Sequence, residues 1–410
     1  MREKVTDTPY KTSLLGALAG LLACLLPFLA VKANRIVNGH NLALWNLRAP
    51  APVAILILIV LLSIAATLVL RSRRQITGAL LATAAGCGLF VLSWLLIAEE
   101  AAQLVPPGID QPARVSPAAG FWLFMLASYV LLTSGLRLLR PAGQSRTRLL
   151  SATISTVLVG LLAILIASGS LNGLSIMKEF YNQPERFVQA LGSHLTIAGV
   201  SVLVAILIGV PLGIIAWRRR ALEHSIFAVV NGIQTIPSLA LFGIMIAPLA
   251  LLSRTFPFLQ ALGIQGIGNA PAMIAITLYA LLPITRNTYT SLSVIDRAII
   301  DSGRGMGMGR FQMLRFVEIP LSLPIILGGI RISAVQAVGN TAVAALIGAG
   351  GLGIFVFQGL GQAAPDLILL GVVPIILLAV AVDRIMKALV ELLTPRGIRL
   401  PDQTEGGADD

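Results

Sequence analysis

The residue types that most often carry out chemistry are few in this chain and widely spaced. The three histidines, His40, His194 and His224, lie far apart and do not show the spacing of metal ligands. Cys24 and Cys87 both fall inside apolar segments, which indicates no disulfide framework. We therefore expect no catalytic residue and no metal site, and we interpret the histidines as loop or helix-end residues.

Two other patterns have the form of reactive or nucleotide-binding sites. Glycines at positions 348, 350 and 353 have the spacing of a dinucleotide-binding loop, but an apolar segment of membrane type precedes them where a strand is required. Asp366 follows too closely to hold a ribose, so we interpret 348–353 as a flexible loop on the outer side. Glu99 and Glu100 are adjacent carboxylates, but they lie at an outer helix end and are expected to be solvated.

The composition explains this scarcity, because it is that of a membrane protein. Of the 410 residues, 56% are hydrophobic and only 12% are charged, whereas a soluble domain has about 25% charged residues. The net charge of +12 is dispersed in short basic clusters between apolar runs. This pattern argues against nucleic acid as a partner and for a lipid bilayer.

The apolar runs predict an all-α, polytopic membrane protein with about ten transmembrane helices, because about 20 residues cross a bilayer as a helix. The first run is longer than the core of a signal peptide, so an uncleaved helix is expected, although Val31-Lys32-Ala33 also fits a cleavage site. We expect the helices at 13–31, 52–70, 76–98, 118–137, 149–167, 192–217, 224–252, 271–291, 321–347 and 367–393.

The distribution of basic residues predicts the orientation of these helices. If the N-terminus is placed in the cytoplasm, most of the 30 Lys and Arg fall in inner segments or at inner helix ends, as the positive-inside rule requires. We therefore expect an inner-membrane protein with both termini in the cytoplasm. The outer loops then hold only Lys32, Arg35, Arg48, Arg114, Lys178, Arg186 and Arg254.

The chain is expected to have four parts. Residues 1–170 form an N-terminal membrane region of five helices whose role is unknown, and 171–191 form a periplasmic or interfacial linker. Residues 192–394, rich in Gly, Pro and polar residues, form a second membrane domain with a polar cytoplasmic loop at 292–320. The acidic end, 395–410, is expected to be a disordered cytoplasmic tail.

The loop 292–320 is the largest polar interruption of the second membrane domain. We expect short helices at 299–306 and 311–317, with Gly307–Gly309 turning the chain, because glycine adopts a positive φ without steric cost. Pro320 suits the first turn of the next helix, where its missing N–H costs nothing. A helix–turn–helix that projects from the membrane presents a knob to a partner and does not form a catalytic pocket.

The segment Asp301–Pro320 resembles the EAA loop of ABC importer permeases. That pattern is Glu-Ala-Ala, three residues, glycine, nine residues and Ile-x-Leu-Pro. Ser302-Gly303 departs from the alanines and weakens helix propensity before the turn. The matching positions are Asp301, Ser302 and Gly303 for Glu-Ala-Ala, Gly307 for the glycine, and Val317, Ile319 and Pro320 for the closing residues.

The resemblance extends over about 192–394 and leaves the first 170 residues outside it. Within this range, several segments look most like the glycine betaine/choline permease subfamily, some members of which carry extra N-terminal helices. These segments are His194–Thr196, Val210–Gly213, Gln234–Leu239, Leu281–Asn287 and Gly348–Gly353.

The resemblance implies a C-terminal five-helix core of the type I ABC importer permeases, paired with a second permease subunit as a homodimer or heterodimer. It further implies a cytoplasmic ABC ATPase dimer and a periplasmic substrate-binding protein. The chain has no G-x-x-x-x-G-K-[ST] segment, so ATP is expected on the partner and no cofactor on this chain. The residues expected to couple to the ATPase are Asp301, Ser302, Gly303, Arg304, Gly307, Glu318 and Pro320.

The expected function is therefore that of a permease subunit for glycine betaine/choline-type osmoprotectants, and not that of an enzyme. An importer for another small solute, such as an amino acid, is the first alternative. An ATP-independent secondary transporter would need inverted repeats and deep carboxylates, which we do not find. A membrane-embedded enzyme would need a nucleophile, a metal cluster or paired carboxylates at depth.

Polar residues inside the predicted spans are candidates for lining a translocation path, because burying them in lipid is costly. Interhelical hydrogen bonding is the alternative interpretation. Pro237 predicts a break in the long helix 224–252. Arg286, Arg331 and the pair Asp383–Lys387 are expected near inner helix ends, where their side chains can reach water. The candidates for the path are Gln234, Thr235, Pro237, Ser238, Asn340 and Thr341.

Overall fold

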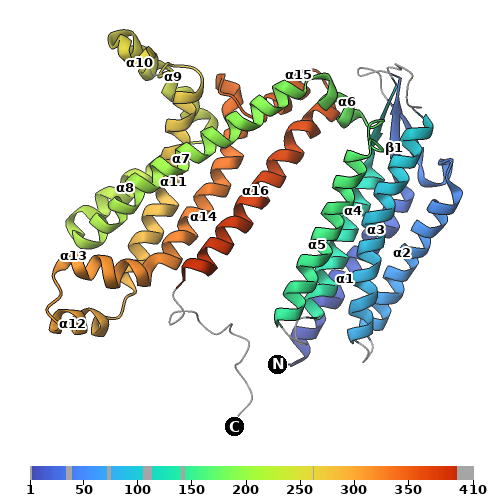
Figure 1. Ribbon diagram of the computed structural model, residues 1–410, viewed down its shortest axis with the longest axis horizontal. Coiled ribbons are helices and arrows are strands. Elements are labelled where there is room, and N and C mark those ends of the chain that lie inside the picture. The colour runs from blue at the N-terminus through green and yellow to red at the C-terminus, as the bar shows by residue number, and fades with distance from the viewer. Residues whose placement is uncertain are drawn as a thin grey trace. The chain divides into compact units, whose positions relative to one another are not determined.

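The computed structural model describes residues 2–33, 39–71, 75–104, 113–139, 144–261 and 263–394. The expected disordered tail, 395–410, lies outside the described residues. The chain divides into two compact units, Met1–Asn182 and Gln183–Asp410 (Figure 1). Each unit has its own buried core, so the two are described separately.

The N-terminal unit is a helical bundle. α4 packs against both α1 and α3, and α3 in turn packs against α2. A short 3-10 turn, Leu44–Asn46, leads into α2. The helices are α1 (Arg2–Leu25), α2 (Pro50–Arg71), α3 (Gln75–Leu104), α4 (Ala119–Leu138), α5 (Gln144–Ala167) and α6 (Ser175–Asn182).

A small antiparallel sheet closes one end of this bundle, with strand order β2-β1-β3. The strands are β1 (Pro27–Lys32), β2 (His40–Ala43) and β3 (Arg114–Pro117). The helix predicted at 13–31 is therefore too long, because α1 ends at Leu25 and Pro27 begins a strand. Proline lacks the N–H that would continue the helix and disfavours helical geometry in the residue before it. The fold class is all-α as predicted, with this sheet as a small addition.

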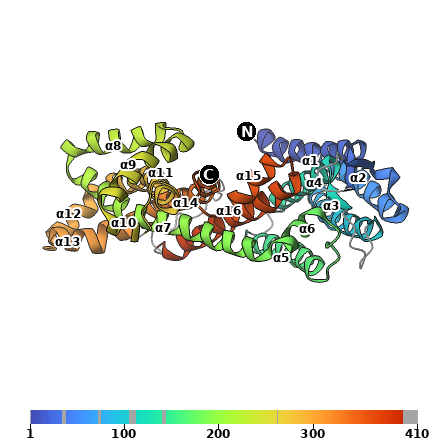
Figure 2. The same cartoon turned by 90° about the horizontal axis from the view of Figure 1, so that it is seen from above.

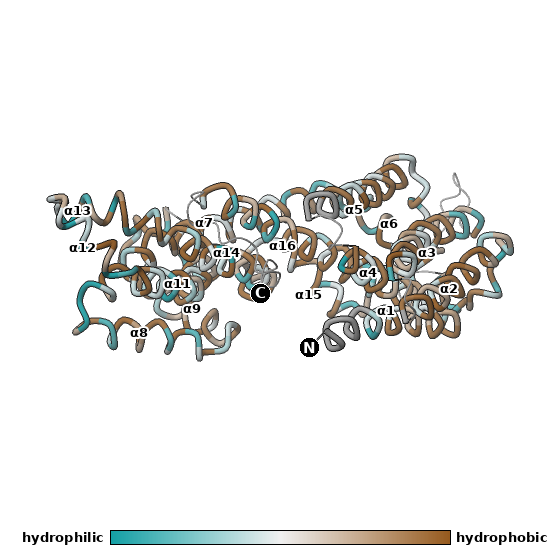
Figure 3. Tube along the Cα trace, turned by 90° about the horizontal axis from the view of Figure 1, so that it is seen from below, coloured by the Kyte–Doolittle hydropathy of each residue, from teal (hydrophilic) through white to brown (hydrophobic). Residues whose placement is uncertain are grey.

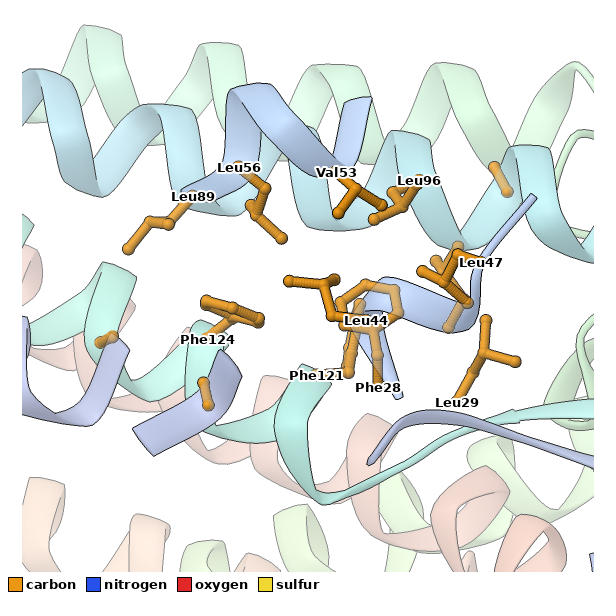
Figure 4. Packing of buried hydrophobic residues seen from close by; sticks show 14 of the residues in the cluster. Phe28, Leu29, Leu44, Leu47, Val53, Leu56, Leu89, Leu96, Phe121 and Phe124 are labelled. Carbon is orange, nitrogen blue, oxygen red and sulfur yellow. The ribbon is translucent and has the colours of Figure 1, made fainter. Parts of the chain in front are cut away.

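Aromatic packing forms the centre of the N-terminal core. The rings of Phe28, Phe121 and Phe124 are fully buried, and Phe28 meets the other two edge-on at centroid distances of 5.8 and 6.1 Å (Figure 4). Such edge-to-face pairs contribute roughly 0.5–1.5 kcal/mol beyond their area burial. Because Phe28 belongs to β1, these contacts join the sheet to α4.

Glu100 is buried, whereas we expected it to be solvated. Its Oε1 accepts a hydrogen bond of 2.9 Å from the backbone N–H of Ala49, just before α2. The carboxyl group therefore satisfies a buried backbone donor at the start of a neighbouring helix. A second buried carboxylate, Glu179 of α6, pairs with Arg114 of β3 and ties that helix to the sheet.

The C-terminal unit is built around α11. In the view from above, α9 and α14 gather with α11 beside α7, and α14 also packs against α16 (Figure 2). Two short 3-10 or π segments, Ala345–Ile347 and Leu314–Glu318, flank α14. The helices are α7 (Pro184–Arg218), α8 (Arg220–Thr235), α9 (Ser238–Thr255), α10 (Pro257–Ala261), α11 (Asn269–Ser293), α12 (Arg297–Gly305), α13 (Arg310–Met313), α14 (Ile319–Ala344), α15 (Gly353–Gly361) and α16 (Pro365–Leu393).

Glycines allow the helices of this unit to approach α11 closely. A Cβ on Gly213 of α7 would lie 2.7 Å from the carbonyl oxygen of Thr285, and one on Gly329 of α14 would lie 2.7 Å from that of Pro283. Small residues at such crossings are typical of packed membrane helices. Gly328 and Gly339 of α14, by contrast, face open space.

Eight helices in the described part of the chain are long and apolar enough to cross a membrane, against about ten predicted. The apolar part of α1 is shorter, Tyr10–Leu25, because β1 follows it. α11 is long enough, but it carries polar residues that are buried between its neighbours, such as Thr285 and Thr288. In Figure 3 the tube is brown along much of α2 and α5, whereas α8 carries hydrophilic stretches.

Candidate functional site

The expected knob is present as a helical hairpin at the end of the C-terminal unit opposite α15 (Figure 1). The side chain of Asp296 accepts a 2.9 Å hydrogen bond from the N–H of Ala298 and caps α12. Gly307 then turns the chain with φ of +80°, as predicted, and α13 begins at Arg310. We call residues 296–318 the knob.

Contacts between methionine and glycine hold the two helices of the knob together. Gly303 is buried, and a Cβ at this position would collide with the end of the Met313 side chain. Met308 lies nearby, with its sulfur 3.5 Å from the same point. Gly303 stands where the EAA pattern has its second alanine, and the side chain of Met313 fills the space that the missing methyl group leaves.

The outer face of the knob combines charge with exposed apolar side chains. Asp301 and Arg304 approach to 3.5 Å, and their side chains are 70% and 71% exposed. Ser302 donates a 2.7 Å hydrogen bond to the carbonyl of Ala298 within α12. Met306 and Phe311 are 72% and 69% exposed beside these polar groups. Sequence reasoning did not single out these two residues, although large apolar side chains in a polar loop are a signal for a partner surface.

The base of the knob is fixed by a partly buried ion pair. Glu318 is 4% exposed, and its Oε2 accepts a 3.2 Å hydrogen bond from Nη2 of Arg218 at the end of α7. The same nitrogen lies 3.4 Å from the carbonyl oxygen of Arg310. Glu318 therefore anchors the knob to α7 and does not belong to its outer face. Pro320 is half-buried in the first turn of α14, as its chemistry predicts.

The helix predicted at 224–252 is broken where proline predicted a break. α8 ends at Thr235, and α9 begins at Ser238. The side-chain amide of Gln234 donates a 2.9 Å hydrogen bond to the carbonyl of Tyr279 on α11, and the Tyr279 hydroxyl donates to the carbonyl of Ile236. Thr235 is exposed and bonds within α8, and Pro237 and Ser238 lie at the break itself.

The two remaining candidates for the path lie on α14 and differ in exposure. Thr341 is fully buried, and its hydroxyl donates a 2.7 Å hydrogen bond to the carbonyl of Ala337 on the same helix. Asn340 is half-buried. Among the described residues, no hydrogen bond joins this pair to Gln234 or its neighbours at the helix break.

An ion pair that sequence reasoning missed crosses from α14 to α16. The guanidinium of Arg331 donates through Nε and Nη2 to the two carboxylate oxygens of Asp383, at 2.6 and 2.8 Å. We had expected Arg331 near the inner end of its helix. It lies instead about halfway along α14. Both side chains border a cavity of about 570 Å³ that is also lined by Asn287 and Gln336.

The glycine loop at 348–353 is tied down, whereas we expected a flexible loop. The N–H of Leu352 donates to Nδ1 of His194 at 3.3 Å, and the N–H of Gly350 donates to Oδ1 of Asn269 at 3.0 Å. Because Nδ1 of His194 accepts, the ring proton is on Nε2, which donates to the carbonyl of Val338 at 3.0 Å. His194 is therefore a fully buried link between α7, α14 and this loop.

Comparison with known proteins places this architecture in a family. Residues 205–397 match the family described as binding-protein-dependent transport system inner membrane component, and residues 9–177 match the N-terminal domain of the ABC transporter permease YehY. The osmoprotectant import permease protein OsmW of Salmonella typhimurium is 42% identical over 206 residues, which are 50% of this chain and 91% of that protein. This chain belongs to the binding-protein-dependent transport permeases.

Two further relatives of the permease cover a similar range. The carnitine transport permease protein OpuCB of Listeria monocytogenes is 42% identical over 52% of this chain and 90% of its own length. The choline transport system permease protein OpuBB of Bacillus subtilis is 37% identical over 50% of this chain and 88% of its own length. Among solved structures, the MetNI methionine ABC transporter has a TM-score of 0.46 and 24% identity, over 52% of this chain and 99% of that one.

Family membership confirms the resemblance to ABC importer permeases that the sequence analysis drew from the segment Asp301–Pro320. The permease is a multi-pass inner-membrane subunit of an ABC importer and not itself an enzyme. Permeases of this family act with an ATPase and a substrate-binding protein. The match to the YehY N-terminal domain ends at residue 177, five residues before the end of the first compact unit.

Proposed function

We propose that the permease imports quaternary-amine osmoprotectants of the glycine betaine and choline type. The observation that carries this proposal is the identity of 36–42% over half of the chain to permeases named for osmoprotectant, carnitine, choline and glycine betaine transport. The alignments cover about nine-tenths of those proteins, so the likeness spans nearly their whole length. The family model matches residues 205–397, and the proposed translocation domain is 192–394 in the second unit.

The knob is the proposed contact with a cytoplasmic ABC ATPase dimer. Its exposed face offers the charges of Asp301 and Arg304 next to the apolar side chains of Met306 and Phe311, a combination suited to a groove on a protein partner. Ser302, Gly303 and Gly307 give this face its shape. Glu318 and Pro320 lie at the base, where closure of the ATPase would be passed to α7 and α14.

The translocation path is proposed to lie between this permease and a second permease subunit, which completes a homodimer or heterodimer. Gln234, Thr235, Pro237 and Ser238 then act at the helix break, and Asn340 with Thr341 acts on α14. Polar groups at membrane depth are costly unless they face a cavity or another protein, which supports this placement. A periplasmic binding protein would deliver the solute to the outer side, and residues 1–170 would form an accessory membrane region.

The proposed topology places both termini and the knob in the cytoplasm. Alkaline-phosphatase fusions after Gly169 and Gln260 are expected to be active, and fusions after Arg220 and Arg310 inactive, because the enzyme becomes active only outside the cytoplasm. The measurement is phosphatase activity normalised to the amount of fusion protein. An active fusion after Arg310 would place the knob outside and exclude its contact with an ATPase.

Reconstitution tests the transport function directly. The permease, purified with its partner ATPase and binding protein and placed in liposomes, is expected to accumulate radiolabelled glycine betaine or choline only when ATP is hydrolysed. The permease alone is expected to bind no nucleotide. Accumulation of an amino acid in place of both amines, or accumulation driven by an ion gradient without ATP, would overturn the proposal.

A further inference from the structure

The Arg331–Asp383 pair lies within two helices that are long and apolar enough to span a membrane. Arg331 lies about halfway along α14, and Asp383 lies on α16, both within helices that can span a membrane. Charged side chains within such segments are rare and mark pathways or partners more often than passive structure. The two side chains remain 35% and 36% exposed, so the pair is not sealed inside the helix packing.

The pair borders an open pocket whose lining is mostly apolar and carries a few polar groups. The cavity of about 570 Å³ is bordered by the pair, by the amides of Asn287 and Gln336, and by the apolar side chains of Ile325, Ile332 and Val335. Its volume is within the range of roughly 300–1,000 Å³ that is usual for small-molecule sites. Convergent polar groups with an apolar wall would be unfavourable against lipid tails, which indicates that the cavity faces water, solute or protein.

We propose that this cavity is a solute-binding subsite for zwitterions, in which Arg331 and Asp383 exchange their mutual ion pair for the two ends of the solute. The guanidinium of Arg331 binds a carboxylate through two parallel hydrogen bonds, as it now binds Asp383. The Asp383 carboxylate then faces the cationic end. A quaternary ammonium has no N–H to donate, so it is attracted to the carboxylate by charge alone.

The ion pair explains how such a site stays stable when it is empty. With no solute bound, each charge neutralises the other, so neither is left unpaired in the membrane. When a zwitterion binds, the Arg331–Asp383 contact is lost. Arg331 then pairs with the carboxylate of the solute and Asp383 with its ammonium, so no charge is left without a partner. A simple cation such as choline satisfies only Asp383 and leaves Arg331 unpaired. The subsite therefore favours glycine betaine over choline.

This inference rests on the proposed function, and the experiment separates the two. In the complete importer, Arg331→Gln is expected to lower uptake of glycine betaine about tenfold or more, the usual cost of losing hydrogen bonds to a charged group, while choline uptake is retained. Asp383→Asn is expected to reduce uptake of both amines. If Arg331→Gln reduces both equally, the pair is structural and the subsite is excluded. If the wild-type importer takes up neither amine, the proposed function fails instead.

Cysteine accessibility provides a readout that does not depend on the charge variants folding normally. In a background with Cys24 and Cys87 replaced by serine, Gln336→Cys is expected to react with a water-soluble thiol reagent and to be protected by glycine betaine. Leu377→Cys is the control, because Leu377 is 63% exposed on α16 but does not line the cavity. Absence of labelling at position 336, or labelling that glycine betaine does not slow, would overturn the subsite.

Discussion

Replacement of Gly307 with valine is expected to leave the permease inserted and abundant in the membrane while uptake falls steeply. Gly307 has φ of +80°, and no heavy atom lies within 4 Å of the position of its missing Cβ. The cost is therefore backbone strain alone, roughly 1–2 kcal/mol for a left-handed residue with a side chain. Because the knob lies outside the helical core, this strain should misplace the knob without unfolding the protein. Uptake, ATPase co-purification and membrane abundance are the measurements.

Gly305 supplies the matched control for this change. It also faces open space, but it lies in α12 without a positive φ, so Gly305→Val adds the same side chain without left-handed strain. We expect this control to retain most of the uptake. Gly307→Asn should recover part of the function, since asparagine adopts the left-handed region more readily than valine. Wild-type transport by Gly307→Val would make the knob a simple connector.

Removal of the Arg218 side chain is expected to have the second large effect. Arg218→Ala leaves Glu318 buried without its cationic partner at the base of the knob. The lost hydrogen bond to a charged group costs on the order of 2 kcal/mol, which would loosen the attachment of the knob to α7. We expect faster proteolysis within 296–318 and reduced uptake.

Two comparisons distinguish this local effect from a general loss of positive charge. Arg219→Ala removes the neighbouring charge, for which no ion pair is found in the described residues, and should change little. The double variant Arg218→Ala with Glu318→Ala should be less impaired than the sum of the two single changes, because no unpaired charge remains. Additive losses in the double variant would show that the pair does not act as a unit.

The sequence was sufficient to predict features that depend on local chemistry. The turn at Gly307 and the break at Pro237 were both predicted correctly, because glycine and proline constrain the backbone wherever they occur. The fold class and the family followed from the apolar runs and from the spacing between Asp301 and Pro320. The roles assigned to the individual coupling and path residues remain predictions.

Features that depend on which helices face each other could not be predicted. Asp383 was assigned a neighbour on its own helix, Lys387, but its carboxylate reaches Arg331 on α14, and only the packing of α14 against α16 brings them together. The same reason applies to His194, whose partners on α14 and in the glycine loop are far away in sequence. The strand at 27–32 was missed because its apolar residues continue the hydropathy of α1.

The break between α8 and α9 has a mechanical consequence. No backbone hydrogen bond of the described residues crosses from the end of α8 to the start of α9, since the N–H of Ile236 bonds back to Ile233 and that of Leu241 bonds to Pro237. A change in the angle between the two helices would therefore be absorbed by the dihedral angles of the linking residues, with no helical hydrogen bond broken. Tyr279 of α11 holds the α8 side of this break, because its carbonyl accepts from Gln234 and its hydroxyl donates to the carbonyl of Ile236. Such a change would leave the end of α8 attached to α11, and neither helix would have to unwind.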